Sequence, residues 1–265
     1  MQLVELQRNV FEKQATDVAV MAVSYDPVQV LADFGTKNGI KFPLLSDVGS
    51  RVMGELGLLN PNMPEETGYW GFTYAEKHQG LPYPGTFLLD NAGVVVDKVF
   101  ERSHRVRMGG NVLLDRLGLE ARGGGTVATA SGPAVTAAAW ADVDEYFPNQ
   151  VMRLTIRLAV EDGFHIYVPP NPSGFTELMV DIPGQEDVYM FSFPMPAGHA
   201  FSVEGFTEAF TVAEGDIEVV VPFYVQQNLE AVTIPIRITY QACNDTICLP
   251  PVVLDLALDL REIRA

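Results

Sequence analysis

Cys243 and Cys248 are the only two cysteines among the 265 residues, and their spacing predicts chemistry more clearly than any other pair. The residues before Cys243 alternate like a strand, and residues 244–247 have the length and composition of a four-residue hairpin loop. A hairpin holds its strands about 5 Å apart, which brings facing cysteines within the Cα separation that a disulfide requires. We therefore predict that the two thiols form a redox pair.

The short spacing of Cys243 and Cys248 weakens a purely structural role for the pair. A disulfide stabilises a fold mainly by restricting the unfolded chain, and this restriction is small when the closed loop is short. Two cysteines without histidines also supply too few ligands for a structural zinc site, and we predict neither a metal nor a cofactor. The alternative is that both cysteines are small buried side chains that never oxidise, which a thiol count with and without reductant decides.

Residues after about 135 have a pattern typical of short strands. Apolar and polar residues alternate at 153–158, and turn signals at 162–163, 183–184 and 214–216 separate the apolar segments. The predicted strands are 152–160, 177–182, 206–212, 217–223, 232–240 and 252–260. This pattern favours an all-β sandwich.

The first 120 residues instead alternate between helical and strand patterns. The predicted helices are 2–14, 28–38, 49–56 and 106–117, and the predicted strands are 18–24, 42–47, 86–90 and 94–100. The glycine-rich and small-residue composition of 121–134 predicts a flexible linker. The predicted fold class is therefore α/β followed by all-β, with domains at 1–120 and 135–265.

A specific motif surrounds the cysteine pair. Tyr-Gln-x-Cys at 240–243 and Cys-x-Pro-Pro at 248–251 resemble the N-terminal (alpha) domain of the thiol:disulfide interchange protein DsbD. Gly-Phe-His-Ile-Tyr at 163–167 is similar to an early segment of that family, and Glu-Gly-Phe at 204–206 falls where the family has a loop that caps the cysteines. The resemblance spans about 135–260. It implies an immunoglobulin-like sandwich that exchanges disulfides with thioredoxin-fold partners.

The same resemblance implies roles for individual residues. Cys248 is expected to form the mixed disulfide with the partner, and Cys243 to resolve it. The other candidates around the pair are the capping residues Phe206 and Glu204 and the lining residues Tyr167, Tyr240 and Gln241. Phe206 is expected to shield the pair until a partner displaces it, whereas core packing fits both tyrosines equally well. For His165, a satisfied or surface role is the first expectation and tuning of the site the second.

The N-terminal half resembles the peroxiredoxin-like (AhpC/TSA, redoxin) branch of the thioredoxin fold, through the residues at 24–26, 42–47 and 84–90. That family implies a central sheet with helices on both faces, a reactive cysteine at a helix start, and a loop facing the thiol, here Pro84, Gly85 and Thr86. This sequence has no cysteine before Cys243. We expect an incomplete thioredoxin-like domain that begins after its first strand and active cysteine, by truncation or a misassigned start, and that cannot reduce peroxide on its own.

Composition excludes some classes of partner. The formal net charge of −17 disfavours nucleic acids and anionic lipid surfaces, both of which select positive charge. No apolar run is long enough to span a bilayer, and the first residues lack the features of a signal peptide. The DsbD-like motif nevertheless points to an extracytoplasmic compartment, where disulfides persist. The sequence leaves the compartment and the oligomeric state open.

Two functions follow from these observations. The first is a thiol–disulfide oxidoreductase module that uses Cys243 and Cys248 and is fused to a redoxin domain inactive as a peroxidase. The alternative is a non-catalytic module that binds partners and contains a structural or inert cysteine pair. Changing both cysteines to serine discriminates between them, because only the second function survives that change.

Overall fold

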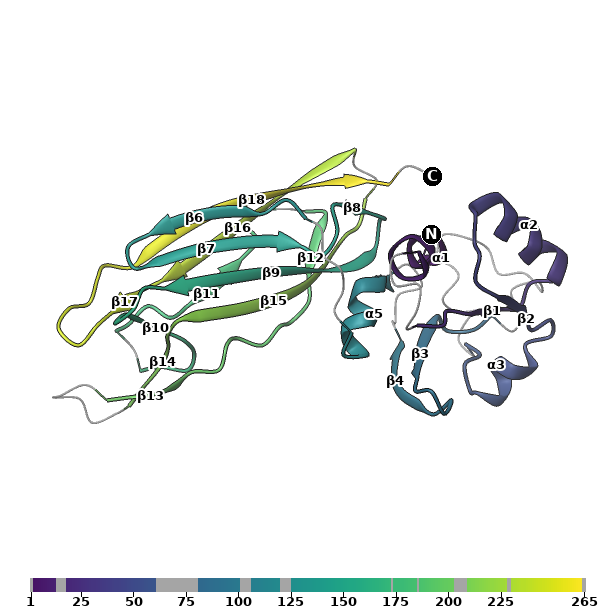
Figure 1. Cartoon of the computed structure of the whole chain (residues 1–265), viewed down its shortest axis with the longest axis horizontal. Helices are drawn as coiled ribbons and strands as arrows, with labels where there is room; N and C mark the ends of the chain where they lie inside the picture. The colour runs from purple at the N-terminus through teal and green to yellow at the C-terminus, as the bar shows by residue number, and fades with distance from the viewer. Residues whose placement is uncertain are drawn as a thin grey trace. The chain divides into compact units, whose positions relative to one another are not determined.

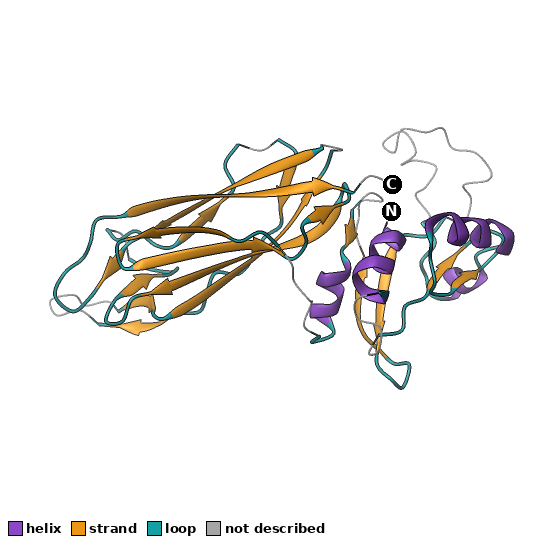
Figure 2. Cartoon of the chain, turned by 45° about the horizontal axis from the view of Figure 1, so that its top comes forward, coloured by secondary structure: helices purple, strands orange, loops and turns teal. Residues whose placement is uncertain are grey.

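The computed structural model describes residues 2–12, 18–60, 81–100, 106–119, 125–172, 174–184, 186–202, 209–227 and 230–263. The chain divides into two compact units, Met1–Ala121 and Arg122–Ala265. Short helices and strands alternate in the first unit, whereas strands dominate the second (Figure 1, Figure 2).

The first unit contains short elements whose ends follow local signals. They are α1 (Gln2–Leu6), the π-helix η1 (Gln7–Phe11), β1 (Ala22–Ser24), α2 (Val28–Asn38), β2 (Leu44–Ser46), α3 (Arg51–Glu55), β3 (Gly85–Leu89), β4 (Val95–Phe100), β5 (Arg107–Met108) and α5 (Gly110–Arg116). Helix α2 ends at Gly39, whose positive φ of 66° is the usual left-handed C-terminal cap. The predicted hairpin is confirmed as β3–β4, with the Asp90 carboxylate accepting the N–H groups of Ala92 and Val94 in the turn.

The strands of the first unit form two small sheets. Strands β1 and β2 pair in parallel, and β3 and β4 pair antiparallel. Within the described residues these pairs are separate sheets. The single central sheet of a thioredoxin-like domain therefore stays a prediction.

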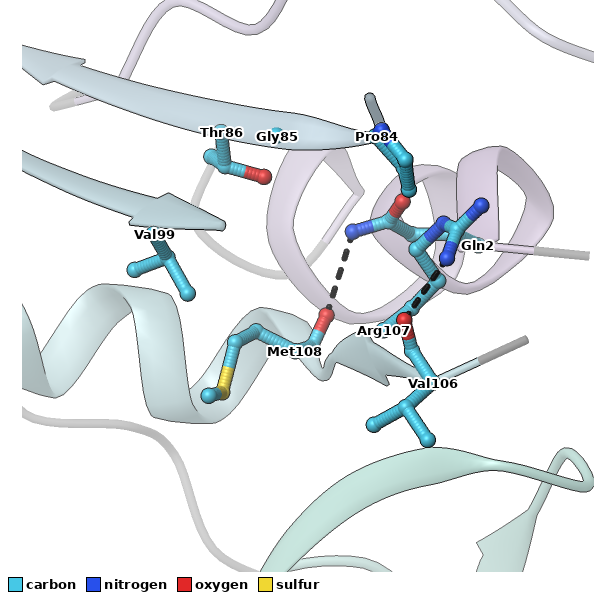
Figure 3. A pocket seen from close by; sticks show the side chains of 8 residues that line it. All are labelled: Gln2, Pro84, Gly85, Thr86, Val99, Val106, Arg107 and Met108. Atoms are coloured by element: carbon cyan, nitrogen blue, oxygen red, sulfur yellow. Dashed lines mark hydrogen bonds between the residues drawn. The ribbon is translucent and has the colours of Figure 1, made fainter. Parts of the chain in front are cut away.

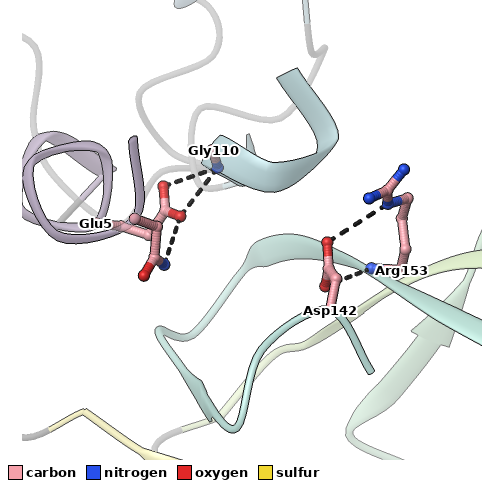
Figure 4. A network of polar contacts seen from close by, with 5 residues as sticks. Glu5, Gly110, Asp142 and Arg153 are labelled. Atoms are coloured by element: carbon pink, nitrogen blue, oxygen red, sulfur yellow. Dashed lines mark hydrogen bonds and ion pairs between the residues drawn. The ribbon is translucent and has the colours of Figure 1, made fainter. Parts of the chain in front are cut away.

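The first helix differs from the predicted helix over 2–14. It changes from α to π geometry at Gln7, which shifts the angular spacing of its side chains. Of the apolar residues that would share one face of a regular α-helix, Leu3, Leu6, Val10 and Phe11, only Val10 is buried. Glu5 is buried instead, at 1% exposure. Its two carboxylate oxygens accept the N–H of Gly110 at 2.9 Å each, at the first residue of α5 (Figure 4). A carboxylate is favourable at a helix N-terminus because the N–H groups there lack partners within the helix.

The second unit contains thirteen strands among its described residues. They are β6 (Ala128–Gly132), β7 (Val135–Ala141), β8 (Glu145–Tyr146), β9 (Gln150–Val160), β10 (His165–Tyr167), β11 (Met179–Asp181), β12 (Val188–Met190), β13 (His199–Phe201), β14 (Phe210–Ala213), β15 (Asp216–Val225), β16 (Ala231–Tyr240), β17 (Ala242–Cys243) and β18 (Val252–Glu262). One sheet has the order β12-β15-β9-β7-β6, a second β11-β16-β18-β8, and a third β13-β14-β10-β17.

The first two sheets enclose one hydrophobic core between them. This arrangement confirms the prediction that two β-sheets pack on each other as a sandwich. The long strands show why: burial alternates along β15, β16 and β18, so every second residue faces inward. In β16 the inward residues are Val232, Ile234, Ile236, Ile238 and Tyr240. Such strict alternation is typical of antiparallel sheets with one solvated face.

Part of the predicted linker is a strand. Residues 128–132 form β6, which pairs antiparallel with β7. Small residues fit the site because a Cβ at Gly132 would lie 2.6 Å from the hydroxyl of Tyr240. Composition alone does not separate a flexible linker from an edge strand of small residues, because the pairing with β7 is a tertiary contact.

A buried ion pair joins Asp142, the residue after β7, to Arg153 on the neighbouring strand β9. The Asp142 carboxylate accepts the N–H of Arg153 at 3.0 Å, and the Arg153 Nε lies 3.5 Å from the second carboxylate oxygen (Figure 4). Burial raises the pKa of Asp142 to about 6, more than the hydrogen bonds and the charge of Arg153 lower it.

Candidate functional site: the Cys243–Cys248 disulfide

The two cysteines are joined by a disulfide, with their Cα atoms 4.1 Å apart. The predicted hairpin loop is confirmed, since Cys243 and Cys248 face each other in an antiparallel bridge and the N–H of Asn244 donates to the carbonyl of Ile247. The Asn244 side-chain oxygen also accepts the N–H groups of Thr246 and Ile247, both at 2.9 Å. This side chain therefore holds the loop in a tight turn of the kind that asparagine favours.

The two sulfur-bearing residues differ in exposure. Cys243 lies in β17 and is 1% exposed, whereas Cys248 is on the surface at the end of the loop. The loop tip beside Cys248 is apolar, because the Ile247 side chain is 51% exposed. A thiolate that approaches from solvent therefore reaches Cys248 and not Cys243.

The sheet β13-β14-β10-β17 has two apolar faces, and Cys243 lies on only one of them. Ile166, Ala213 and Ala242 face the main core. Their strand neighbours point to the opposite side, because successive side chains alternate across a strand. These neighbours form a separate cluster of Tyr167, Phe210, Val212 and Cys243, with Phe175 and Phe201 packed against it. We call this group the cysteine cluster.

Tyr167 contacts the disulfide directly. Its hydroxyl lies 3.8 Å from the Cys248 Sγ, and the hydroxyl is the donor because a disulfide sulfur has no proton. The ring packs against Phe175 and Phe210, with centroids 4.7 and 5.7 Å away. Burial raises the pKa of Tyr167, so its proton stays available for donation to sulfur.

Gln241 fixes the position of the hairpin. Its Nε2 donates to the carbonyl of Leu249 at 3.1 Å, and its Oε1 accepts the N–H of Thr176 at 3.0 Å. The side chain therefore ties the residue after Cys248 to a separate loop. Gln241 supports the site through the backbone and does not reach the sulfur atoms by any described hydrogen bond.

His165 is buried opposite Cys243, whereas the first expectation for it was a satisfied or surface role. It is 3% exposed and is the direct cross-strand neighbour of Cys243 in the pairing of β10 with β17. The sequence signal was present, since His165 and Tyr167 are two residues apart in a strand and so share a face. The sequence does not give the register between β10 and β17, and this register places His165 opposite Cys243.

Tyr240 was predicted as a possible lining residue, and the structure places it in the main core instead. It is fully buried there, and its hydroxyl donates to the carbonyl of Pro133 at 3.0 Å. The reason is that successive side chains along a strand point to opposite faces. Tyr240 continues the inward-facing series of β16, whereas Cys243 lies three residues later and points to the other face. The predicted capping residues Glu204 and Phe206 lie outside the described residues.

The predicted thioredoxin-like loop of the first unit is at the start of β3. Gly85 pairs with Phe100 and Thr86 with Val99 in the β3–β4 ladder. Pro84, Gly85 and Thr86 line a small hollow together with Gln2, whose side chain donates to the carbonyl of Met108 at 3.3 Å (Figure 3). A Cβ on Gly85 would lie 2.1 Å from the Phe100 ring, so any larger residue here would require that ring to move. The hollow contains no thiol, because the first unit has no cysteine.

The motifs and the disulfide geometry agree with two family matches. Residues 137–259 match the family described as thiol:disulfide interchange protein DsbD, N-terminal. Residues 1–98 match the AhpC/TSA family. Both resemblances drawn from the sequence motifs are thereby confirmed. Each half of the chain is thus similar to a family of thiol-based redox proteins.

Solved structures similar to the chain include the N-terminal domains of two other proteins. The N-terminal periplasmic domain of ScsB from Proteus mirabilis is 18% identical, with 50% of this chain and 49% of that chain covered and a TM-score of 0.35. The reduced N-terminal domain of DsbD from Neisseria meningitidis is 16% identical, with 51% and 86% covered and a TM-score of 0.32. The match thus spans about half the length of the ScsB domain. No curated protein matches the chain.

The described residues were also compared with the requirements for a membrane span and for a metal site. None of the described helices is long and apolar enough to cross a membrane. No group of three or more His, Cys, Asp or Glu side chains converges in a metal-binding arrangement within the described ranges.

Proposed function

We propose that this protein exchanges disulfides through Cys243 and Cys248 and thereby transfers electrons to or from thioredoxin-fold proteins. The observation that supports this most strongly is the disulfide itself, which joins one exposed and one buried cysteine in a region that matches the DsbD N-terminal family. A structural disulfide gains most by closing a long loop and hiding both sulfurs, and this pair does neither.

The exchange begins at Cys248. A partner thiolate attacks the exposed Cys248 Sγ, the bond to Cys243 breaks, and Cys243 leaves as a thiolate. The second partner thiol then attacks the mixed disulfide, which releases Cys248 and leaves the partner oxidised. The Tyr167 hydroxyl, 3.8 Å from the Cys248 Sγ, stabilises negative charge that develops on this sulfur. The reverse sequence oxidises the cysteine pair and reduces the partner.

The partner class follows from the shape and chemistry of the hairpin. Ile247 gives the tip an exposed apolar side chain beside the reactive sulfur. A partner that has an apolar surface beside its reactive cysteine would complement this isoleucine. The resemblance to the DsbD family points to the same class.

For the first unit we propose a thioredoxin-like domain without peroxidase activity in this chain. A peroxidase needs a thiolate at a helix N-terminus, and the only cysteines here are the pair in the second unit. Purified chain with the Cys243–Cys248 pair alkylated should therefore consume no hydrogen peroxide. Consumption of hydrogen peroxide by the alkylated protein would contradict this part of the proposal.

Mixed-disulfide trapping tests the exchange function. The reduced Cys243→Ser variant, mixed with a Cys-x-x-Ser thioredoxin-fold protein whose single cysteine is activated as a nitrothiobenzoate mixed disulfide, should accumulate a covalent complex through Cys248. The matched Cys248→Ser variant retains a cysteine that solvent does not reach, and it should trap little or none. Equal trapping by both variants would contradict the assigned order of attack. Partner binding that persists unchanged in a variant without either cysteine, with no trapped complex, would favour a binding module instead.

A further inference from the structure

His165 is a buried polar side chain that the exchange mechanism above does not use. Its imidazole is 3% exposed and lies opposite Cys243 across the β10–β17 pair. Directly opposed residues on antiparallel strands have Cβ atoms about 5 Å apart on the same face of the sheet. The imidazole and the buried sulfur therefore belong to one small compartment.

The walls of this compartment are aromatic. The His165 ring lies 4.4 Å from the Phe201 ring and 5.7 Å from the Tyr167 ring, measured between centroids. The His165 Nε2 atom is buried and has no hydrogen-bond partner among the described residues. Buried polar atoms without hydrogen-bond partners are uncommon in folded proteins, and those that occur often have a functional role. A proton that moves on and off a neighbouring sulfur is one such explanation.

The charges around His165 fit that use. Burial lowers the pKa of His165, so the ring is neutral at pH 7 and can accept a proton. Glu214, which follows β14, and Asp245, in the cysteine hairpin, favour the protonated ring, whereas His199 on β13 opposes it. Among the residues that the structure describes, the other titratable groups on this face are Tyr167 and the Cys243 thiol of the reduced protein. A ring that is neutral at rest and flanked by two carboxylates can hold a proton transiently.

We propose that His165 accepts the proton of the Cys243 thiol when the reduced pair attacks a partner, and returns it when Cys243 leaves as a thiolate. This inference rests on the proposed exchange function. It assigns to His165 a direct role at the buried sulfur, where water does not reach. Buried thiols ionise with difficulty, so a local base matters most at this position.

The steps balance as follows. The Cys248 thiolate attacks a partner disulfide and expels one partner thiolate. The Cys243 thiol passes its proton to the His165 Nε2, and its thiolate attacks the Cys248 Sγ and expels the second partner thiolate. That thiolate takes the proton from the imidazolium. Two electrons pass from the cysteine pair to the partner disulfide, which becomes one thiol and one thiolate, and that thiolate takes its proton from solvent.

A two-step reaction with an aromatic disulfide isolates the step that involves His165. Reduced full-length chain is mixed with 5,5′-dithiobis(2-nitrobenzoate). Attack by Cys248 releases one nitrothiobenzoate, and resolution by Cys243 releases a second. The rate of the second release is measured from pH 5 to pH 10 for the wild type, His165→Gln, and the control His199→Gln, which removes an exposed histidine from the same sheet.

Wild type should resolve at a rate that levels off near neutral pH, where the neutral ring is the base. His165→Gln should be about tenfold slower or more at pH 7, because only about 3% of an unassisted thiol with the ordinary pKa of about 8.5 is ionised there, and should converge with wild type at pH 10, where the thiol ionises unaided. His199→Gln should stay within about twofold of wild type. A variant slowed by the same factor at every pH would show a purely structural role and overturn the proposal.

The wild-type profile tests the proposal even if His165→Gln does not fold. A resolution rate that keeps rising tenfold per pH unit up to about pH 8.5, the ordinary thiol pKa, shows that no base assists Cys243 and overturns the inference. The failure of the exchange function itself looks different, because wild type would then release fewer than two equivalents of nitrothiobenzoate at any pH.

Discussion

Reduction of the Cys243–Cys248 disulfide should lower the stability of the second unit only modestly. The bond joins residues five positions apart, so it closes a loop of about six residues. Loop-closure entropy for that length gives a contribution of about 2 kcal/mol at 25 °C. For a domain the size of Arg122–Ala265, a loss of about 2 kcal/mol lowers the melting temperature by about 5–10 °C. The core between the two large sheets contains neither sulfur, so it stays intact.

Calorimetry of the full chain with and without a phosphine reductant measures this difference. Only the transition of the second unit should move, and a Cys243→Ser/Cys248→Ser variant should show no response to the reductant. A pair that exchanges electrons must be reducible without unfolding its domain. Loss of the transition on reduction, or a fall of more than about 20 °C, would refute the reasoning and show that the bond is structural. A melting temperature that reduction leaves unchanged would refute the loop-closure estimate.

Three further predictions follow from the polar contacts. Tyr167→Phe removes the hydroxyl that donates to the Cys248 Sγ, and should slow reduction of the disulfide by dithiothreitol about two- to tenfold. An unchanged rate would show that the hydroxyl does not act on sulfur. Gln241→Leu removes two hydrogen bonds to backbone groups and should lower the free energy of unfolding by about 2 kcal/mol in urea titrations. A loss below about 0.5 kcal/mol would contradict this. For Asp142, whose pKa in the fold is raised to about 6, the native state binds the proton more tightly than the unfolded chain does. Its contribution to stability is therefore complete below about pH 4 and is lost as the pH rises through 6, on the order of 3 kcal/mol in all. Asp142→Asn should flatten that part of the pH dependence of the unfolding free energy, and an unaltered slope would contradict the raised pKa.

Local patterns predicted much of the second unit. The alternation in β15, β16 and β18 was visible in the sequence, because one buried face forces a period of two. Strands β6 and β7 were not predicted. Their residues are mostly small, and small residues suit a linker, a turn or a tightly packed edge equally well.

The cysteine hairpin could be predicted from local features of the chain. The spacing of Cys243 and Cys248, the loop between them and the prolines after them are local features, and local chain geometry is enough to bring the two sulfurs together. The residues that lie around the pair could not be predicted in this way, because they depend on how distant strands pair and pack. Tyr240 and His165 were both uncertain, and register placed the first in the main core and the second opposite Cys243. The alternation of side chains along a strand shows which residues share a face. Packing against other strands determines which face contacts the main core and which face contacts the disulfide.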